Sequence, residues 1–217
     1  MRGSRRDIGA ALAAMCVGCT TPPASMPRAV NGVRALVDTL YYPVYGATPR
    51  EWATSSQKEA ARAGVLVPHL AMTAFANKWV YFLHPSEYGC ELREPVVLLG
   101  IRFVMPRLAI DSGVSADDMA AWQGRQRSLW IHEGAHATIA MRSAIEFRDS
   151  LRVLHSSECG LLDSRVQGVA SGVTTRAQAL QDSLDARARR GQVLAGQIAA
   201  FRRTVLAVDT TFRDSVP

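Results

Sequence analysis

The heptapeptide Trp130–His136 constrains the fold and the chemistry of this chain more than any other stretch. It contains the pattern His-Glu-x-x-His within a segment whose apolar residues have helical spacing. On a helix, His132 and His136 lie one turn apart on the same face. Two imidazoles placed in this way can bind one Zn²⁺, which takes nitrogen, oxygen or sulfur ligands in tetrahedral geometry. The pattern therefore predicts a zinc site on a helix.

Glu133 follows the first histidine and indicates what the metal would do. Zinc lowers the pKa of a water molecule toward neutrality, and Glu133 could accept the proton of that water as a general base. This is the metalloprotease arrangement, so peptide or protein substrates are expected. Two other interpretations stay open. One is a surface helix with two unrelated histidines, and the other is a pair of core histidines satisfied by hydrogen bonds.

The apolar stripe of the same helix predicts where the histidines point. Its members follow spacings of three and four: Leu129, His132, His136, Ile139, Ser143, Phe147, Leu151 and Leu154. Both histidines are therefore expected on the buried stripe and not on the solvated face. A bound cation would explain two neighbouring histidines there, because unpaired polar groups are costly to bury.

The N-terminal residues 1–19 predict an export signal. A positive start precedes an apolar stretch, residues 8–18, that is too short to span a bilayer. The residues before Cys19 resemble a bacterial lipoprotein signal, so a lipid anchor at Cys19 and ordinary cleavage nearby are both open. The protein is expected in the periplasm, as an outer-membrane lipoprotein, or secreted; a cytoplasmic protein with a frayed N-terminus is the alternative. Residues 20–30 then form a Pro- and Thr-containing linker.

Residues 31–217 are expected to form a single domain, and 48% hydrophobic content in 217 residues is enough for a sizeable core. The net charge of +6 is spread over single arginines without interleaved aromatic residues. Nucleic acid is therefore not an expected partner. Membrane contact is expected only through the possible lipid anchor at Cys19, and the sequence sets no oligomeric state.

Three stretches predict strands. Residues 33–46 are rich in β-formers, and Pro43 places their strand at a sheet edge. Residues 69–83 and 90–108 predict a long antiparallel hairpin, with a bulge at Gly100. His69 and His84 are interpreted as ordinary strand-end or loop residues.

Three stretches predict helices. A capping box at Thr48–Glu51 begins a helix that should end near residue 63. Ser115 caps a long helix that carries the histidines and ends near residue 154. A second long helical pattern covers residues 162–205. Because the connection between the long helices is short, they should lie antiparallel. The predicted fold is α+β, with a small antiparallel sheet packed on a helical hairpin.

A zinc site of this kind needs a third protein ligand. The histidines lie about twenty residues before the helix–helix turn, so residues 180–188 of the second helix should face them. Asp185 is the acid there that adjoins the apolar stripe, which makes it the first choice. Glu158 is the second choice for this ligand, because it lies at the far end of the helical hairpin. A solvated Asp185 without a metal is the alternative to both.

Cys90 and Cys159 are the cysteines of the expected mature protein. In an exported chain they suggest one disulfide. Two unrelated buried thiols are the alternative, and the lack of a C-x-x-C pair argues against a cysteine zinc site.

The chain resembles the bacterial predicted secreted zinc-dependent proteases, a domain of unknown function, over residues 40–191. The resemblance rests on Tyr-Tyr-x-Val-x-Gly-x-Thr-Pro-x-Glu from Tyr41, a strand that contains Trp79, Cys90-x-Leu with a β-run ending in Met-Pro-Arg-Leu, the His-Glu-Gly-Ala-His motif, and Cys159. It implies that Cys90 and Cys159 bridge the strand hairpin to the helices.

The last motif of that family, Tyr-Asp-x-x-Thr-x-His-Gly, is only partly kept. Asp185 and Gly191 match, whereas Leu184, Ala188 and Arg190 replace the Tyr, Thr and His. Arg190 cannot bind zinc, but its charge could polarise a carbonyl or stabilise an oxyanion. Two functions follow as expectations: a zinc peptidase of the cell envelope, or a non-catalytic envelope interaction module with a degenerate or structural metal site.

Overall fold

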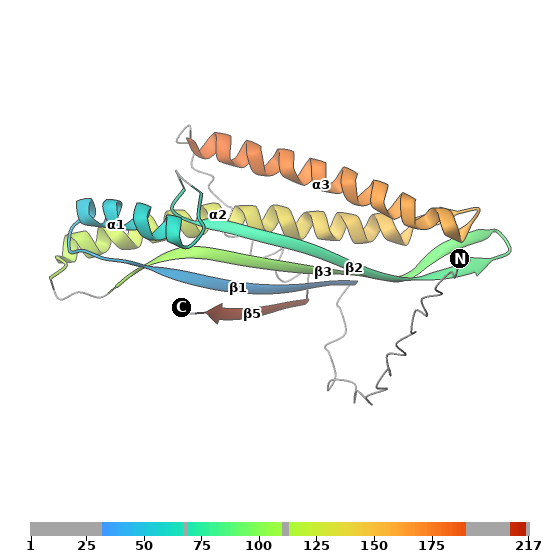
Figure 1. The fold of residues 1–217 in the computed structure, drawn as a ribbon, viewed down its shortest axis with the longest axis horizontal. Helices are drawn as coiled ribbons and strands as arrows, with labels where there is room; N and C mark the ends of the chain where they lie inside the picture. The colour runs from blue at the N-terminus through green and yellow to red at the C-terminus, as the bar shows by residue number, and fades with distance from the viewer. Residues whose placement is uncertain (1–31, 67–68, 110–112, 190–208, 216–217) are drawn as a thin grey trace, which may run out of the picture.

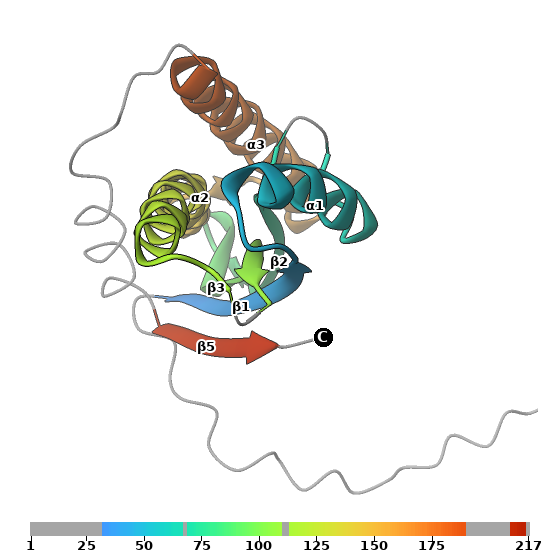
Figure 2. The same ribbon diagram turned by 90° about the vertical axis from the view of Figure 1, so that its left-hand side faces the viewer.

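The computed structural model describes residues 32–66, 69–109 and 113–189 in full, and the backbone of 209–215. The elements follow the order β1 (Val33–Val44), α1 (Pro49–Arg62), β2 (Met72–Ser86), β3 (Gly89–Leu108), α2 (Ala116–Arg152), β4 (His155–Ser156), α3 (Cys159–Arg189) and β5 (Asp209–Ser215). In Figure 2 the three helices lie on one side of the sheet, with α3 farthest from it. The predicted α+β fold is confirmed.

The sheet has the order β2-β3-β1-β5, with β4 added beside β3. β2 and β3 form the predicted antiparallel hairpin. β1 pairs with β3 and with β5 in parallel, so the sheet is mixed and not wholly antiparallel. The expected edge position of β1 is also wrong along Arg34–Leu40, where β5 pairs with it. Pro43 lies beyond that pairing, in the part of β1 that pairs with β3 and not with β5.

The predicted bulge at Gly100 is wrong. Gly100 pairs in regular register with Ala76, and the register shift lies between Val80 and Phe82. Across this shift β2 advances by two residues and β3 by three. The extra β3 residue coincides with Glu94, which has a left-handed φ of 51°. The twist that a bulge introduces therefore falls near the hairpin tip, away from the histidines.

α1 begins with the predicted capping box, in which the Thr48 side chain accepts from the Glu51 backbone N–H and the Glu51 carboxylate accepts from the Thr48 N–H. Its Trp52 is 2% exposed and packs edge to face on Trp122 near the start of α2, with ring centroids 5.4 Å apart. α1 thereby closes one end of the core.

α2 and α3 form the helical hairpin that Figure 1 shows over the sheet. The buried face of α2 includes Phe147 and Leu151 of the predicted stripe, and also Ala137, Ala140 and Ala144, which are at most 1% exposed. The histidines are not centred on this face, which corrects the expectation from the sequence. His132 and His136 lie on the flank toward α3, with side chains 21% and 13% exposed.

A disulfide joins Cys90 on β3 to Cys159 at the start of α3, as predicted, with a Cα–Cα distance of 5.0 Å. Cys90 is 3% exposed. β4, which the sequence analysis did not predict, pairs its two residues with Cys90 and Glu91 beside this bridge. The sheet and the helical hairpin are therefore joined covalently at one end.

Several predictions lie outside the described residues. They are the export signal at residues 1–19, the linker at 20–30, the helical pattern beyond Arg189, and Arg190. In the part of the chain that the structure describes, no helix has the length and apolar character needed to span a membrane.

Candidate metal centre

His132, His136 and Asp185 converge at one point between α2 and α3. Nε2 of His132 and Nε2 of His136 lie 3.1 Å apart. Asp185 Oδ1 lies 3.1 Å from the first of these nitrogens and 3.0 Å from the second. The antiparallel helices thus bring Asp185 to the histidines, as the count along the hairpin predicted.

The three atoms fit the donor set and the size of a zinc site. Zinc–nitrogen and zinc–oxygen distances of about 2.0–2.1 Å imply a tetrahedral ligand–ligand edge of about 3.3 Å. The separations of 3.0–3.1 Å lie close to that edge. A zinc ion held by these three atoms would keep a fourth position for water or substrate, as catalytic zinc sites do. The Asp185 side chain is 26% exposed, so solvent reaches the cluster.

Glu133 lies on the sheet-facing side of α2, and it is 3% exposed. Thr73 on β2 holds it: Oγ1 of Thr73 lies 2.8 Å from the carboxylate Oε2 and 3.1 Å from the backbone carbonyl of Glu133. Burial raises the pKa of Glu133 above its ordinary value, and the Thr73 hydrogen bond opposes this shift. A carboxyl group with a raised pKa is suited to accept and return a proton near neutral pH.

His132 has a pKa below its ordinary value, chiefly because burial disfavours the imidazolium and then because His136 is near. A neutral imidazole is the form that binds a metal. His69 also contributes to the electrostatics of His132 and Glu133, although it is not one of the three clustered residues. From the sequence His69 is expected to be an ordinary strand-end or loop residue, and no motif spacing connects it to His132.

Gln181 is a site residue that the sequence analysis missed. It is 5% exposed on α3, one turn before Asp185, and its amide contacts both the ring and the backbone carbonyl of His136. The spacing of Gln181 and Asp185 on α3 mirrors that of His132 and His136 on α2. This i, i+4 pairing was the one signal in the sequence that could have identified it.

The second-choice ligand, Glu158, is not part of the cluster. It immediately precedes α3, 27 residues before Asp185, at the opposite end of the helical hairpin. The residues that the structure brings together are therefore His132, His136 and Asp185, with Glu133 beside them. Arg190 remains a prediction.

A family model described as "Bacterial protein of unknown function (DUF922)" matches residues 39–191. The chain belongs to this family. The match includes all three clustered residues, Glu133 and both cysteines of the disulfide. Neither a curated protein nor a solved structure matches the chain.

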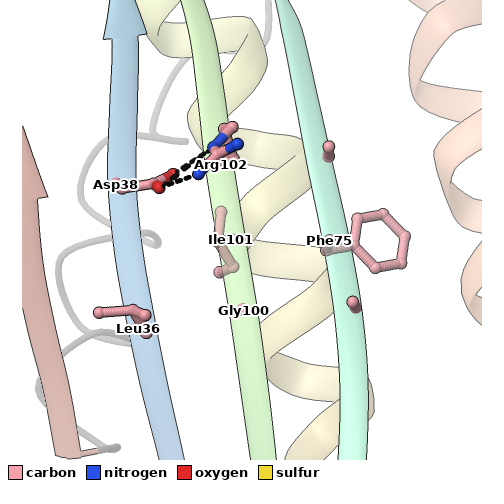
Figure 3. Close-up of a pocket in the computed structure, with 8 residues that line it drawn as sticks. Leu36, Asp38, Phe75, Gly100, Ile101 and Arg102 are labelled. Carbon is pink, nitrogen blue, oxygen red and sulfur yellow. Dashed lines mark hydrogen bonds and ion pairs between the residues drawn. The ribbon is translucent and has the colours of Figure 1, made fainter. Parts of the chain in front are cut away.

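This DUF922 protein has a depression on the face of the sheet away from the helices (Figure 3). Gly100 and the alanines of β2 form its floor, and Arg102 lies beside it. Arg102 is already paired with Asp38 by two guanidinium nitrogens, at distances down to 2.6 Å. The two charged side chains that line this depression therefore pair with each other.

The loop that carries His69 is anchored by Tyr42, whose hydroxyl donates to the backbone carbonyl of Leu70. Burial raises the pKa of Tyr42 from 10.0 to about 12. A group whose pKa is raised by folding contributes stability that is complete below its unfolded pKa and is lost as the pH rises through its folded pKa. This contribution should therefore fall between pH 10 and about 12.

We expect Tyr42→Phe to lower the free energy of unfolding by about 1 kcal/mol at neutral pH, the value of one hydrogen bond. The difference from wild type should shrink as the pH rises above 10. Urea unfolding at several pH values measures both free energies. A difference that stays constant up to pH 12 would contradict the assignment of the raised pKa to Tyr42.

Proposed function

We propose that this protein is a zinc-dependent peptidase of the bacterial cell envelope. The observation that supports this most is the convergence of two imidazole nitrogens and one carboxylate oxygen within 3.1 Å of one another. Three such groups repel one another unless they share a proton or a cation. His132, His136 and Asp185 would hold the ion, which when bound supplies a Lewis acid that polarises a carbonyl and makes water more acidic.

In this proposal Glu133 performs the proton transfers. It accepts a proton from the attacking water and returns that proton to the amine of the leaving peptide. Thr73 keeps the carboxylate on the side of β2, so that the base is held in place before substrate binds. The burial of Glu133 excludes bulk water that would otherwise stabilise its charge and weaken it as a base.

An extended peptide is the proposed substrate, because the site adjoins a sheet edge. β2 is the terminal strand of the described sheet and pairs there with β3 alone. Most of its residues are exposed. The other edge of β2 thus presents backbone groups with which a substrate strand can pair, and Thr73 links that strand to Glu133. The N-terminal pattern supports the assignment to the cell envelope.

The peptide assay that tests this proposal compares the zinc-loaded wild type with Glu133→Gln on a peptide library. We expect cleavage by the wild type and none above background by the variant, because the amide cannot accept the proton of water. Zinc content should be equal in both, since Glu133 is not a ligand. Glu146→Gln is the matched control, because Glu146 is on the same helix but pairs with Arg176. Equal cleavage by wild type and Glu133→Gln would contradict the proposal.

The altered final motif favours a second function, a non-catalytic envelope interaction module that keeps the fold with a degenerate or structural metal site. Leu184, Ala188 and Arg190 stand where the resembling family has Tyr, Thr and His. The same assay separates the two functions. Retained zinc without cleavage of any library peptide by the wild type would favour the module.

A further inference from the structure

Gln181 makes two contacts with one residue, His136. Its Oε1 lies at hydrogen-bond distance from the ring atom Nδ1, and its Nε2 donates to the backbone carbonyl of His136 at 3.2 Å. Gln181 is 5% exposed, so water competes little for either contact. In the described part of the chain, no single side chain contacts both the ring and the backbone of His132, the other histidine of the cluster.

These contacts determine which way the amide faces. A backbone carbonyl can only accept a hydrogen bond, so the NH₂ end of Gln181 must face the carbonyl of His136. The oxygen end must then face the imidazole ring. Because that oxygen can only accept, Nδ1 of His136 must carry the proton.

The proton on Nδ1 leaves a free lone pair on Nε2 of the neutral ring. That nitrogen lies 3.0 Å from Asp185 Oδ1 and 3.1 Å from His132 Nε2. In the other tautomer a proton would occupy the space between these three atoms, where a cation would have to bind.

We propose that Gln181 is a positioning residue that holds His136 in the Nδ1–H tautomer and so presents its Nε2 to the metal. This inference rests on the proposed metal site, which it deepens. Outer partners of metal-binding histidines are frequently carboxylates, which make the ring more basic. A neutral amide fixes the tautomer without adding negative charge. The chain thereby keeps one carboxylate, Asp185, in direct reach of the ion.

Gln181→Met removes both hydrogen bonds and keeps a side chain of similar length. We expect its zinc affinity, measured by competition with a chromogenic chelator, to fall about 10–100-fold. Gln181→Glu keeps the acceptor for Nδ1 and should retain an affinity closer to wild type, although its carboxylate repels the His136 carbonyl. Gln178→Met is the control, because Gln178 lies on the same helix and bonds to Asp182. It should bind zinc as the wild type does.

The tautomer itself is measured on metal-free protein by ¹⁵N NMR of the imidazole rings, at a pH where they are neutral. The wild type and Gln181→Glu should show a protonated Nδ1 in His136, and Gln181→Met a mixture of tautomers. A protonated Nε2 in the wild type would overturn the inference. So would Gln181→Met with an unchanged tautomer and a zinc affinity within twofold of wild type. A fixed Nδ1–H tautomer in a wild type that binds no zinc would overturn the proposed metal function and leave the tautomer assignment standing.

Discussion

Replacement of His136 by Ala should abolish zinc retention. His136 provides one of the three clustered atoms, and its loss leaves only His132 and Asp185, on two different helices, to hold an ion. We expect the affinity to fall by more than the roughly 100-fold that follows loss of an outer partner of a metal ligand. His132→Ala should behave in the same way. Asp185→Ala should weaken retention, because it removes the donor atom that α3 contributes to the described cluster.

Elemental analysis after gentle purification should give close to one zinc per wild-type chain and none for either histidine variant. A chelator should lower the melting temperature of the wild type, because metal binding stabilises the folded state, and should leave that of the variants unchanged. His155→Ala is the control, since His155 lies exposed on β4 far along the hairpin. Stoichiometric zinc in the double variant of His132 and His136 would contradict the site.

The second large effect concerns the disulfide. Cys90 and Cys159 are separated by 69 residues, and closing a loop of this size restricts the unfolded chain. In the chain-entropy model the restriction corresponds to about 4 kcal/mol of stability, and measured values are often smaller. We therefore expect the Cys90→Ala/Cys159→Ala double variant to lose most of that amount. Alanine is chosen because Cys90 is buried and a hydroxyl there would add a separate cost.

Urea unfolding of the oxidised wild type and the double variant measures the difference. The reduced wild type serves as the matched control, since it has the native sequence without the bridge and should resemble the variant. Mass spectrometry of the unreduced protein should show the two cysteine peptides joined. A loss below 1 kcal/mol, or free thiols in protein purified from the cell envelope, would contradict the expected role of the bridge.

The sequence predicted the parts of the site that depend on local spacing. His132 and His136 share a face because of their i, i+4 separation. Asp185 was found by counting residues from the helix–helix turn, because residues equally far from the turn on two antiparallel helices lie opposite each other. The capping box at Thr48 was predicted for the same reason, because it depends only on residues close together in the sequence. Gln181 was not predicted, because an amide that orients a ligand has no motif of its own.

Other features depend on information that a single sequence lacks. The alternation of β1 indicates a strand but not its direction, so its parallel pairing with β3 was missed. The histidines were placed on the buried stripe because large apolar residues define such a stripe in sequence. Phe147 and Leu151 of that stripe are buried in the core, and Phe147 packs on Trp79 of β2. The same core also includes Ala137, Ala140 and Ala144, whose small side chains contribute little to hydropathy. β4 is too short for any periodicity.

The clustered residues are divided between two helices, with both histidines on α2 and Asp185 on α3. Sliding α3 along α2 by one residue would displace Asp185 by about 1.5 Å, whereas metal–ligand distances tolerate only about 0.2 Å. Zinc occupancy would therefore depend on the lengthwise alignment of α3 with α2. A partner or a mechanical load that shifts α3 lengthwise would release the ion before it unfolds either helix.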